Sequence, residues 1–431
     1  MELPSIIILV LSFTIFLSFG VPIAYSLGLS AVLTLVINAD PMAAFTTLAQ
    51  RMATGLDSFT LLAIPFFILA GQLMNKGGIA IRLIDFAKVL VGRLPGGLAF
   101  VNIVANMLFG SISGSAGASA SAIGGFMTPV MEKEGYSRPF SAAVNITSAT
   151  TGLVIPPSNI LIVYSLASGG VSIAALFIAG YLPGILIGLL LMLVAGFYSR
   201  NYKMAETGKI TFKYAIIKFF DALPSIFLLV IVIGGIIAGI FTATEASVIA
   251  VVYTLILAFI YKELKPGDLP EVLLSTVKTV AIVMLLIASS IALSWVLSFE
   301  NVPQNISTAL LNLSDNGIIL LLIINIILLA VGIFMDMTPA VLIFTPIFLP
   351  VMMQFGVDPI HFGIVMIVNL CVGLCTPPVG AVLFIGCSVA DVKIDQVIRP
   401  LLPFFAAMIA ALLLITYIPE ISLWLPGLFG L

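Results

Sequence analysis

The sequence predicts an all-α polytopic membrane protein, made of two inverted repeats that each hold a re-entrant hairpin and a Pro-Pro-broken helix. Three observations predict this class. The 431-residue chain is 61% hydrophobic and only 8% charged, whereas a soluble domain is nearer a quarter charged. Many apolar runs reach the roughly 20 residues that cross a bilayer, and they are continuous rather than alternating as in a barrel. Two distant stretches also repeat one unusual pattern of helix breaks.

The apolar runs predict ten spans and two hairpins. The first two spans form one run that Gly20 and Pro22 divide. No Lys or Arg precedes Arg51, and a cleavable signal peptide needs a basic start, so we expect the first run to be a span. The expected spans cover 4–20, 22–39, 57–75, 139–168, 172–199, 221–240, 243–261, 273–298, 360–390 and 401–418, with hairpins at 97–126 and 316–353.

The positive charges predict the orientation, because Lys and Arg concentrate on the cytoplasmic side. If the N-terminus is outside, Arg51 is the only one of the 17 Lys and Arg residues that falls outside. Both termini are then periplasmic, hairpin 97–126 enters from the cytoplasm, and hairpin 316–353 enters from outside. Charge alone does not separate a re-entrant hairpin from two full spans. The breaks at the tips favour re-entry, although the apolar arm 317–335 leaves two full spans open for the second hairpin.

The expected organisation is a first repeat at 1–205, a cytoplasmic connection at 206–220 and a second repeat at 221–431. Between the third span and the first hairpin, residues 79–93 place their polar side chains on one helical stripe. Such an amphipathic helix lies in the inner membrane interface or packs under the protein, and the sequence leaves both open.

The repeated breaks are the most informative feature. A Gly/Ser tract at 110–121 is followed by Pro156-Pro157, and a break at 332–339 is followed by Pro377-Pro378. Backbone groups left unpaired in lipid cost several kcal/mol each, so broken helices persist where they line a cavity. Two copies predict a secondary transporter with its site near the bilayer midplane. Tight packing of small residues and simple kinks are the structural alternatives.

The chemistry of the breaks suits an ion and an anion. A Pro-Pro pair removes two donors, which frees carbonyls of the preceding turn for a cation, and exposed helix N-termini suit a carboxylate. Asp336 lies at the expected tip of the second hairpin, and an ionisable group at such depth is a functional hypothesis by default. It could bind a cation, a proton or the substrate, or cap a tip that reaches water.

Other classes of function find little support. The chain has no Gly-x-Ser-x-Gly, His-Glu-x-x-His or Walker A motif, and His361 is its only histidine. We therefore expect no enzyme; an intramembrane hydrolase using a serine of 111–121 lacks a base. Cys371, Cys375 and Cys387 have no nearby histidine, so we expect core residues and no transition metal. A net charge of −2 gives no reason to expect nucleic acid.

Five stretches carry a resemblance to a known family: 63–71, 110–116, 332–339, 358–363 and 373–380. With them the chain resembles, over essentially its whole length, the large membrane subunit of tripartite ATP-independent periplasmic (TRAP) transporters of the DctM/SiaM type. The resemblance implies a bacterial inner-membrane protein that works with a small four-span subunit of the DctQ/SiaQ type and a periplasmic binding protein. It also implies uptake of organic acids, such as C4-dicarboxylates or sialic acid, coupled to Na⁺.

The resemblance further implies an elevator-type fold, with a mobile part at about 95–200 and 316–399 and the remainder as scaffold. Two or more Na⁺ ions are expected. The expected Na⁺ residues are Ser111, Ser113, Gly114, Ser115, Ile155, Pro156, Asn159, Gly332, Asp336, Thr338, Gly373, Thr376 and Val379. The expected substrate residues are Ser115, Thr151, Ser158, Asp336 and Thr338. A standalone divalent-anion/Na⁺ symporter without a binding protein is the alternative.

Overall fold

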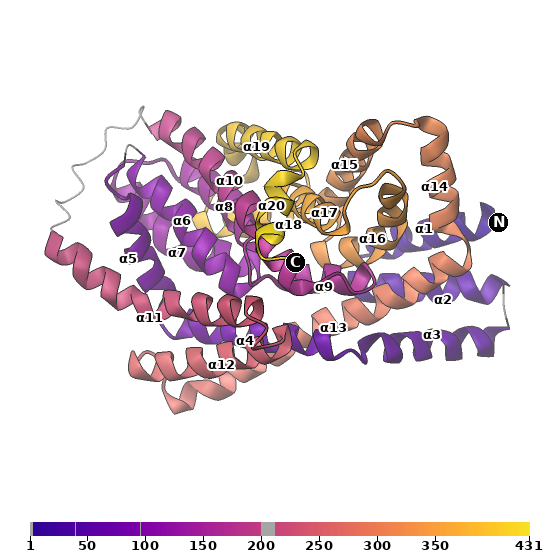
Figure 1. The fold of residues 1–431 in the computed structure, drawn as a ribbon, viewed down its shortest axis with the longest axis horizontal. Coiled ribbons are helices and arrows are strands. Elements are labelled where there is room, and N and C mark those ends of the chain that lie inside the picture. The colour runs from indigo at the N-terminus through magenta and orange to yellow at the C-terminus, as the bar shows by residue number, and fades with distance from the viewer. Residues whose placement is uncertain (1–2, 39, 95, 200–211) are drawn as a thin grey trace.

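The computed structural model describes residues 3–38, 40–94, 96–199 and 212–431 (Figure 1). Within these ranges every regular element is helical, with twenty α-helices and two short 3-10 helices, so the predicted all-α class is confirmed. Eight of the described helices are long and apolar enough to cross a membrane, and the bent pair at 138–167 adds a ninth. The expected hairpins and broken spans are all present as helix pairs.

The helices fall into two series of similar order. The first series is α1 Leu3–Ser18, α2 Ile23–Asn38, α3 Pro41–Leu56, α4 Ala63–Lys76, α5 Ile79–Val91, α6 Gly97–Ser113, α7 Ala116–Lys133, α8 Arg138–Val154, α9 Asn159–Ala167 and α10 Ile173–Ser199. The second is α11 Phe212–Ile237, α12 Ala243–Ile260, α13 Leu269–Phe299, α14 Val302–Leu313, α15 Gly317–Phe334, α16 Met337–Gln354, α17 Pro359–Leu374, α18 Ala381–Ala390 and α19 Ile394–Tyr417, followed by α20 Glu420–Leu428. The 3-10 helix Phe59–Leu62 joins α3 to α4, and this path takes the place that α13 has in the second series. The expected connection at 206–220 lies partly outside the described residues, and α11 begins within it.

Three helices were not predicted: α3, α14 and α20. Helices α3 and α14 are amphipathic, with one polar and one apolar face. Neither therefore forms a continuous apolar run of the kind that predicts a span. Helix α14 precedes the second hairpin just as α5 precedes the first. The second arm of the first hairpin also continues past residue 126 to Lys133, with Pro129 inside the helix.

Helix α5 packs its polar stripe against protein. Arg82 forms an ion pair with Asp221 of α11 at 3.4 Å, and Asp85 pairs with Lys218 at 2.6 Å. The Arg82 guanidinium also lies over the ring of Tyr261, 3.6 Å from its centre. These contacts favour a helix packed under the protein over one that presents its charges to lipid headgroups.

Each hairpin crosses its broken helix at a pair of glycines. Helix α6 meets α8 where Gly110 faces Gly152, and α15 meets α17 where Gly332 faces Gly373. A Cβ atom added to Gly110 would lie 2.9 Å from the Cα of Gly152, and one added to Gly332 would lie 3.0 Å from the Cα of Gly373. The two halves therefore make the same close backbone contact beside their breaks.

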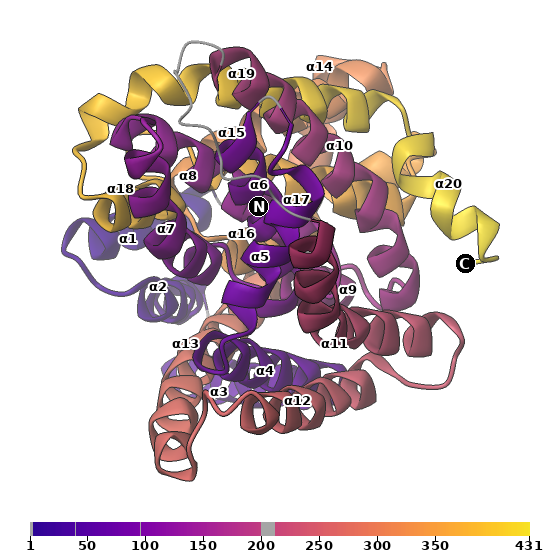
Figure 2. The same ribbon diagram turned by 90° about the vertical axis from the view of Figure 1, so that its left-hand side faces the viewer.

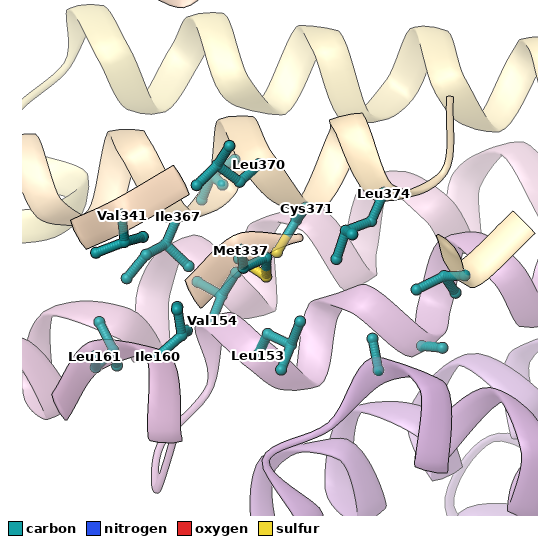
Figure 3. Packing of buried hydrophobic residues seen from close by; sticks show 14 of the residues in the cluster. Leu153, Val154, Ile160, Leu161, Met337, Val341, Ile367, Leu370, Cys371 and Leu374 are labelled. Atoms are coloured by element: carbon teal, nitrogen blue, oxygen red, sulfur yellow. The ribbon is translucent and has the colours of Figure 1, made fainter. Parts of the chain in front are cut away.

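The two broken helices pack against each other at the centre of the molecule. Cys371 and Cys375, on one face of α17, direct their thiols to the carbonyl oxygens of Thr150 and Ile146 in α8, at 3.3 and 3.5 Å. Figure 3 shows Met337, the first residue of α16, close to Cys371 and to residues beside the first break. Helices α8 and α9 are bent by 51° across that break, and both Pro-Pro bonds are cis. The cysteines are buried core residues, as expected.

A second layer is formed by α3, α4, α12 and α13. Helix α13 contacts α2, α3, α4 and α16, while α4 packs along α12. Figure 1 shows α5 and the start of α11 at one end of the molecule, with α14 and the N-terminus at the other. In Figure 2 this layer, with α3, α4, α12 and α13, lies below the hairpins and broken helices. We call the path α3–α4 and helix α13 the long helices.

The glycine crossings generate a test. Gly152→Ala and Gly373→Ala each place a Cβ against the backbone of the partner glycine, and overpacking of this kind costs about 1–3 kcal/mol. We expect both variants to unfold at lower temperature than the parent protein, measured by a thiol-reactive dye that reaches the buried cysteines only on unfolding.

Gly125→Ala is the matched control, because Gly125 lies in α7 with open space around its Cα. Alanine is the better helix former by about 1 kcal/mol, so this variant should unfold at the parent temperature or above it. Equal unfolding temperatures in all three variants would contradict the close crossings.

Candidate functional site

A cavity of about 470 Å³ lies where both hairpin tips approach both helix breaks. We call it the tip cavity. Its walls come from elements that are far apart in the chain. The hairpins supply Phe109, Ser113, Gly114, Ser115, Ala116, Gly117, Ala118, Asp336, Met337 and Thr338; the broken helices supply Leu153, Asn159, Ile160, Val163, Leu374, Ala381, Val382 and Ile385; the long helices supply Ile64, Ile68, Gly71, Gln72, Asn75, Thr279 and Val283.

The first tip turns at Gly114, which has the left-handed conformation (φ 61°) that favours glycine. Ser115 caps α7 by accepting a hydrogen bond from the Ala118 N–H at 3.2 Å. The side chain of Asn159, at the start of α9, lies directly against Gly114. Its Oδ1 atom is buried without a hydrogen-bond partner. A buried acceptor without a donor costs about 1–3 kcal/mol, and an oxygen in that state is a suitable ligand for a cation.

The second tip carries the only acidic side chain among the described residues of the cavity wall, Asp336. Asp336 is the N-cap residue of α16, yet its carboxylate accepts no capping hydrogen bond there. It is exposed toward the cavity, and within the described part of the chain it forms no ion pair. The position agrees with the predicted turn and leaves the carboxylate available to a ligand.

The second break gathers backbone carbonyls. Gly380 has a φ of 22°, and the carbonyl oxygens of Leu374 and Thr376 each lie 2.8 Å from the place where its Cβ would be. Because Pro378 lacks an N–H, the Leu374 carbonyl has no donor one turn later. At the first break the Leu153 carbonyl instead accepts from the Ser158 hydroxyl at 2.5 Å. Converging uncharged oxygens of this kind suit a monovalent cation.

Two helix N-termini border the cavity. Residues 116–118 begin α7 and residues 337–338 begin α16, and all five line the wall. The first turn of a helix carries about half a positive charge and unsatisfied N–H donors, which stabilise an anion. The site thus combines uncharged oxygen atoms at the breaks with helix N-termini at the tips.

The structure brings together only part of the expected site. The tip cavity is lined by Ser113, Gly114, Ser115, Asn159, Asp336 and Thr338. It is not lined by Ser111, Ile155, Pro156, Gly332, Gly373, Thr376 or Val379. Two expected substrate residues are also outside the wall. Thr151 donates its hydroxyl to the Ser148 carbonyl at 2.6 Å, and Ser158 is occupied by Leu153.

Three polar residues of the wall were missed by the sequence analysis: Gln72, Asn75 and Thr279 on the long helices. Gln72 and Asn75 are three residues apart, which places them on one face of α4. Two amide side chains at that spacing inside an apolar span could have indicated a polar cavity beside α4. The sequence does not show which helix faces the cavity, because tertiary packing decides that.

Buried amides join each hairpin to its broken helix. Asn106 of α6 donates to the Asn145 Oδ1 atom of α8 at 3.0 Å, and Asn369 of α17 donates to the Asn325 Oδ1 atom of α15 at 2.6 Å. Asn145 and Asn369 therefore bridge helices, and neither lines the tip cavity. His361 lies outside the cavity, and its Nε2 atom is 3.2 Å from the Thr416 carbonyl.

Comparison with known proteins decides the family. The family model described as "Tripartite ATP-independent periplasmic transporter, DctM component" matches residues 10–421. The chain belongs to this family. The predicted resemblance to TRAP large permeases is confirmed.

This DctM component has relatives along nearly all of its length. It is 55% identical to the uncharacterized protein YgiK of Salmonella typhimurium, over 99% of this chain and 98% of that one. It is 41% identical to the isethionate TRAP transporter permease protein DctMQ of Oleidesulfovibrio alaskensis, over 96% of this chain but only 65% of that longer protein. Large permeases at 36–39% identity are named for C4-dicarboxylates, 2,3-diketo-L-gulonate and sialic acid.

A solved structure shares the fold. The YdaH transporter of Alcanivorax borkumensis superposes with a TM-score of 0.64 at 14% identity, over 91% of this chain and 89% of that one. At such low identity the likeness concerns the fold alone.

Proposed function

We propose that this TRAP large permease is a Na⁺-driven importer subunit that moves an organic acid anion from periplasm to cytoplasm by an elevator movement. The tip cavity carries the proposal. Its wall combines both hairpin tips with the long helices α4 and α13. If the hairpins enter from opposite sides, as the charges predict, tips that meet in one cavity must each stop part-way. Re-entrant hairpins and a site near the midplane then follow.

Na⁺ is the proposed coupling ion because the free ligands are oxygens of low charge. At the first break the Asn159 side chain lies against the Gly114 turn, and its Oδ1 atom is buried without a hydrogen-bond partner. At the second, the carbonyls of Leu374 and Thr376 converge beside Gly380, and Asp336 shares the cavity with Leu374. Two ion positions, one in each half, account for the duplicated breaks. In this proposal Na⁺ is cargo that travels with the substrate.

The anion binds after the cation in this scheme. A Na⁺ ion near Asp336 compensates the only carboxylate in the described wall, which otherwise repels an anion at the N-terminus of α16. The substrate acid group then meets the N–H groups that begin α7 and α16, with the hydroxyls of Ser115 and Thr338 beside them. Each net positive charge carried inward gains about 2.3 kcal/mol per 100 mV of membrane potential. Na⁺ thus couples binding to uptake.

The division of the wall supports the proposed elevator movement. The proposed mobile part, about 95–200 and 316–399, supplies the tips and breaks, while α4 and α13 supply the opposite side. A site split in this way opens when the mobile part slides along the long helices. The expected scaffold also includes α1, α2, α11 and α12.

The substrate class is an organic acid anion, and the partners are those of the family. Relatives are named for sulfonate and carboxylate substrates, which the same N–H groups suit. A small four-span membrane subunit is proposed as partner, because a relative named DctMQ extends beyond the length that this chain matches. A periplasmic binding protein would deliver the substrate, and the complex would reside in the bacterial inner membrane with both termini of this chain periplasmic.

Two other functions fit less well. An intramembrane hydrolase needs a base near Ser113 or Ser115, and the described cavity wall holds no histidine or lysine. A standalone symporter would use the same site without a binding protein, and the uptake assay separates it from the TRAP system.

Uptake into proteoliposomes that hold this chain and its small partner tests the proposal. The labelled probes are succinate, isethionate and N-acetylneuraminate, each with a candidate binding protein outside and an inward Na⁺ gradient. Asp336→Asn removes the carboxylate at nearly constant volume. We expect the uptake of the transported probe to fall at least tenfold, whereas Asp315→Asn, in an exposed loop, leaves it unchanged.

The controls decide between the rivals. Uptake that requires both the gradient and the binding protein supports the TRAP mechanism. Gradient-driven uptake without the binding protein identifies a standalone symporter. Uptake that ignores the gradient refutes Na⁺ coupling.

Asn159 provides an independent prediction about the ion. Asn159→Ala removes the unpaired Oδ1 atom, so the Na⁺ concentration for half-maximal uptake should rise several-fold. Asn159→Asp keeps an oxygen and adds negative charge, so that concentration should stay the same or fall. If neither variant moves the Na⁺ dependence, Asn159 is not an ion ligand.

A further inference from the structure

Helix α13 borders two hollows at different heights. The tip cavity reaches it at Thr279 and Val283. A second hollow, of about 500 Å³, reaches it at Ser294 and Trp295, and also at Ile291 and Ser298. Val283 and Trp295 are 12 residues apart, which is about 18 Å along a helix axis.

We call the second hollow the Arg51 groove. Like the tip cavity, it has one wall from the long helices and one from the proposed mobile part. One wall comes from the long helices, with α13 and the end of α3. The other comes from the proposed mobile part, with the end of α9 and the middle of α16. The remaining lining residues are Arg51, Thr54, Gly55, Asp57, Ser58, Leu166, Ala167, Leu342 and Pro346.

Arg51 occupies this groove in a distinctive way. Its guanidinium lies 5.0 Å from the centre of the Trp295 ring, and that ring stacks on Phe299 with a centre distance of 5.3 Å. Within the described part of the chain Arg51 forms no ion pair. The planar head is therefore held over a fixed aromatic surface while its N–H donors stay available. Guanidinium donors match the two oxygens of a carboxylate or sulfonate in a bidentate pair.

The charge of the groove is balanced. Asp57 is the only acidic side chain among its lining residues, so the groove attracts an anion through the geometry of Arg51 and not through net charge. An acid group held there has one strong partner, in contrast to the two helix N-termini of the tip cavity. The anion should therefore bind more weakly in the groove than in the tip cavity, which suits a transient site that releases the anion to the tips.

We infer that the Arg51 groove is a second binding site for the organic acid anion, on the outer part of the long helices, which holds the acid group before the hairpin tips receive it. The inference rests on the proposed function, because it requires the tips to move along α13. Sliding the mobile part by about 18 Å, the axial distance from Val283 to Trp295, brings Thr338 level with Arg51. Arg51, the one cation expected outside, thereby acquires a specific role.

Tryptophan fluorescence tests the groove directly. The chain has two tryptophans, so Trp424→Phe leaves Trp295 as the only reporter, beneath the Arg51 guanidinium. The full chain in lipid nanodiscs is titrated with succinate and with isethionate as Na⁺-free salts, against chloride at equal ionic strength. We expect a saturable emission change with at least one of these two anions, because the acid group draws the guanidinium from the ring.

The variants predict a graded result in the same background. Arg51→Gln should abolish the response, and Arg51→Lys should weaken it about tenfold because lysine cannot pair with two oxygens at once. Asp57→Asn should strengthen it, since a nearby negative charge is removed. Lys133→Gln removes an exposed cation elsewhere and should leave the titration unchanged. A silent Trp295, or a response that survives Arg51→Gln, overturns the inference.

The test is independent of ion coupling. The titration contains no Na⁺, so it can show anion binding in the Arg51 groove even if uptake does not depend on the Na⁺ gradient. Conversely, if uptake is driven by Na⁺ but the Trp295 emission does not change, the proposed function stands and the binding site in the groove is refuted. In the transport assay, Arg51→Gln should raise the substrate concentration for half-maximal uptake at least threefold, and an unchanged value counts against the inference.

Discussion

The structure depends on one constraint, that a helix interrupted in apolar surroundings must find partners for its free backbone groups. Among the described residues, two hairpin tips and two Pro-Pro breaks interrupt helices in this way. The fold collects all four around one cavity, which is lined by Gly114 and Asp336 from the tips and by Leu153, Asn159 and Leu374 from the breaks. A binding site is the natural outcome of that arrangement, because a ligand completes what the backbone lacks.

Close contact between backbones allows the tips and the breaks to lie around the same cavity. The glycine pairs Gly110–Gly152 and Gly332–Gly373 let each hairpin approach its broken helix without side chains between them. Buried amides tie the same helices together one or two turns away. The cysteines of α17 then bring the two halves into contact through the backbone of α8. Each half is thus tightly packed next to its break.

The sequence revealed the repeated breaks because proline, glycine and an acidic residue stand out in apolar runs. It predicted the helical class, the helix pairs α6–α7 and α15–α16, the position of Asp336 between α15 and α16, and the family for this reason. It missed α3 and α14, since an amphipathic helix at the edge of a membrane protein does not form a continuous apolar run. Thr151 and Ser158, which it counted among the substrate residues, lie outside the wall of the tip cavity, and their hydroxyls donate to nearby carbonyls. Gln72 and Asn75 escaped because a sequence does not say which face of α4 another helix covers.

The central claim is that the hairpin tips travel along α13, and cysteine cross-linking measures this most directly. In a background without the native cysteines, Thr338→Cys would be paired with Thr279→Cys in one protein and with Ser294→Cys in another. The first pair shares the tip cavity; the second joins the tip to the level of the Arg51 groove. The account predicts that both cross-links form in membranes, and that Na⁺ with a transported acid shifts their ratio. Cross-linking of the first pair alone, under every combination of ion and substrate, would contradict it.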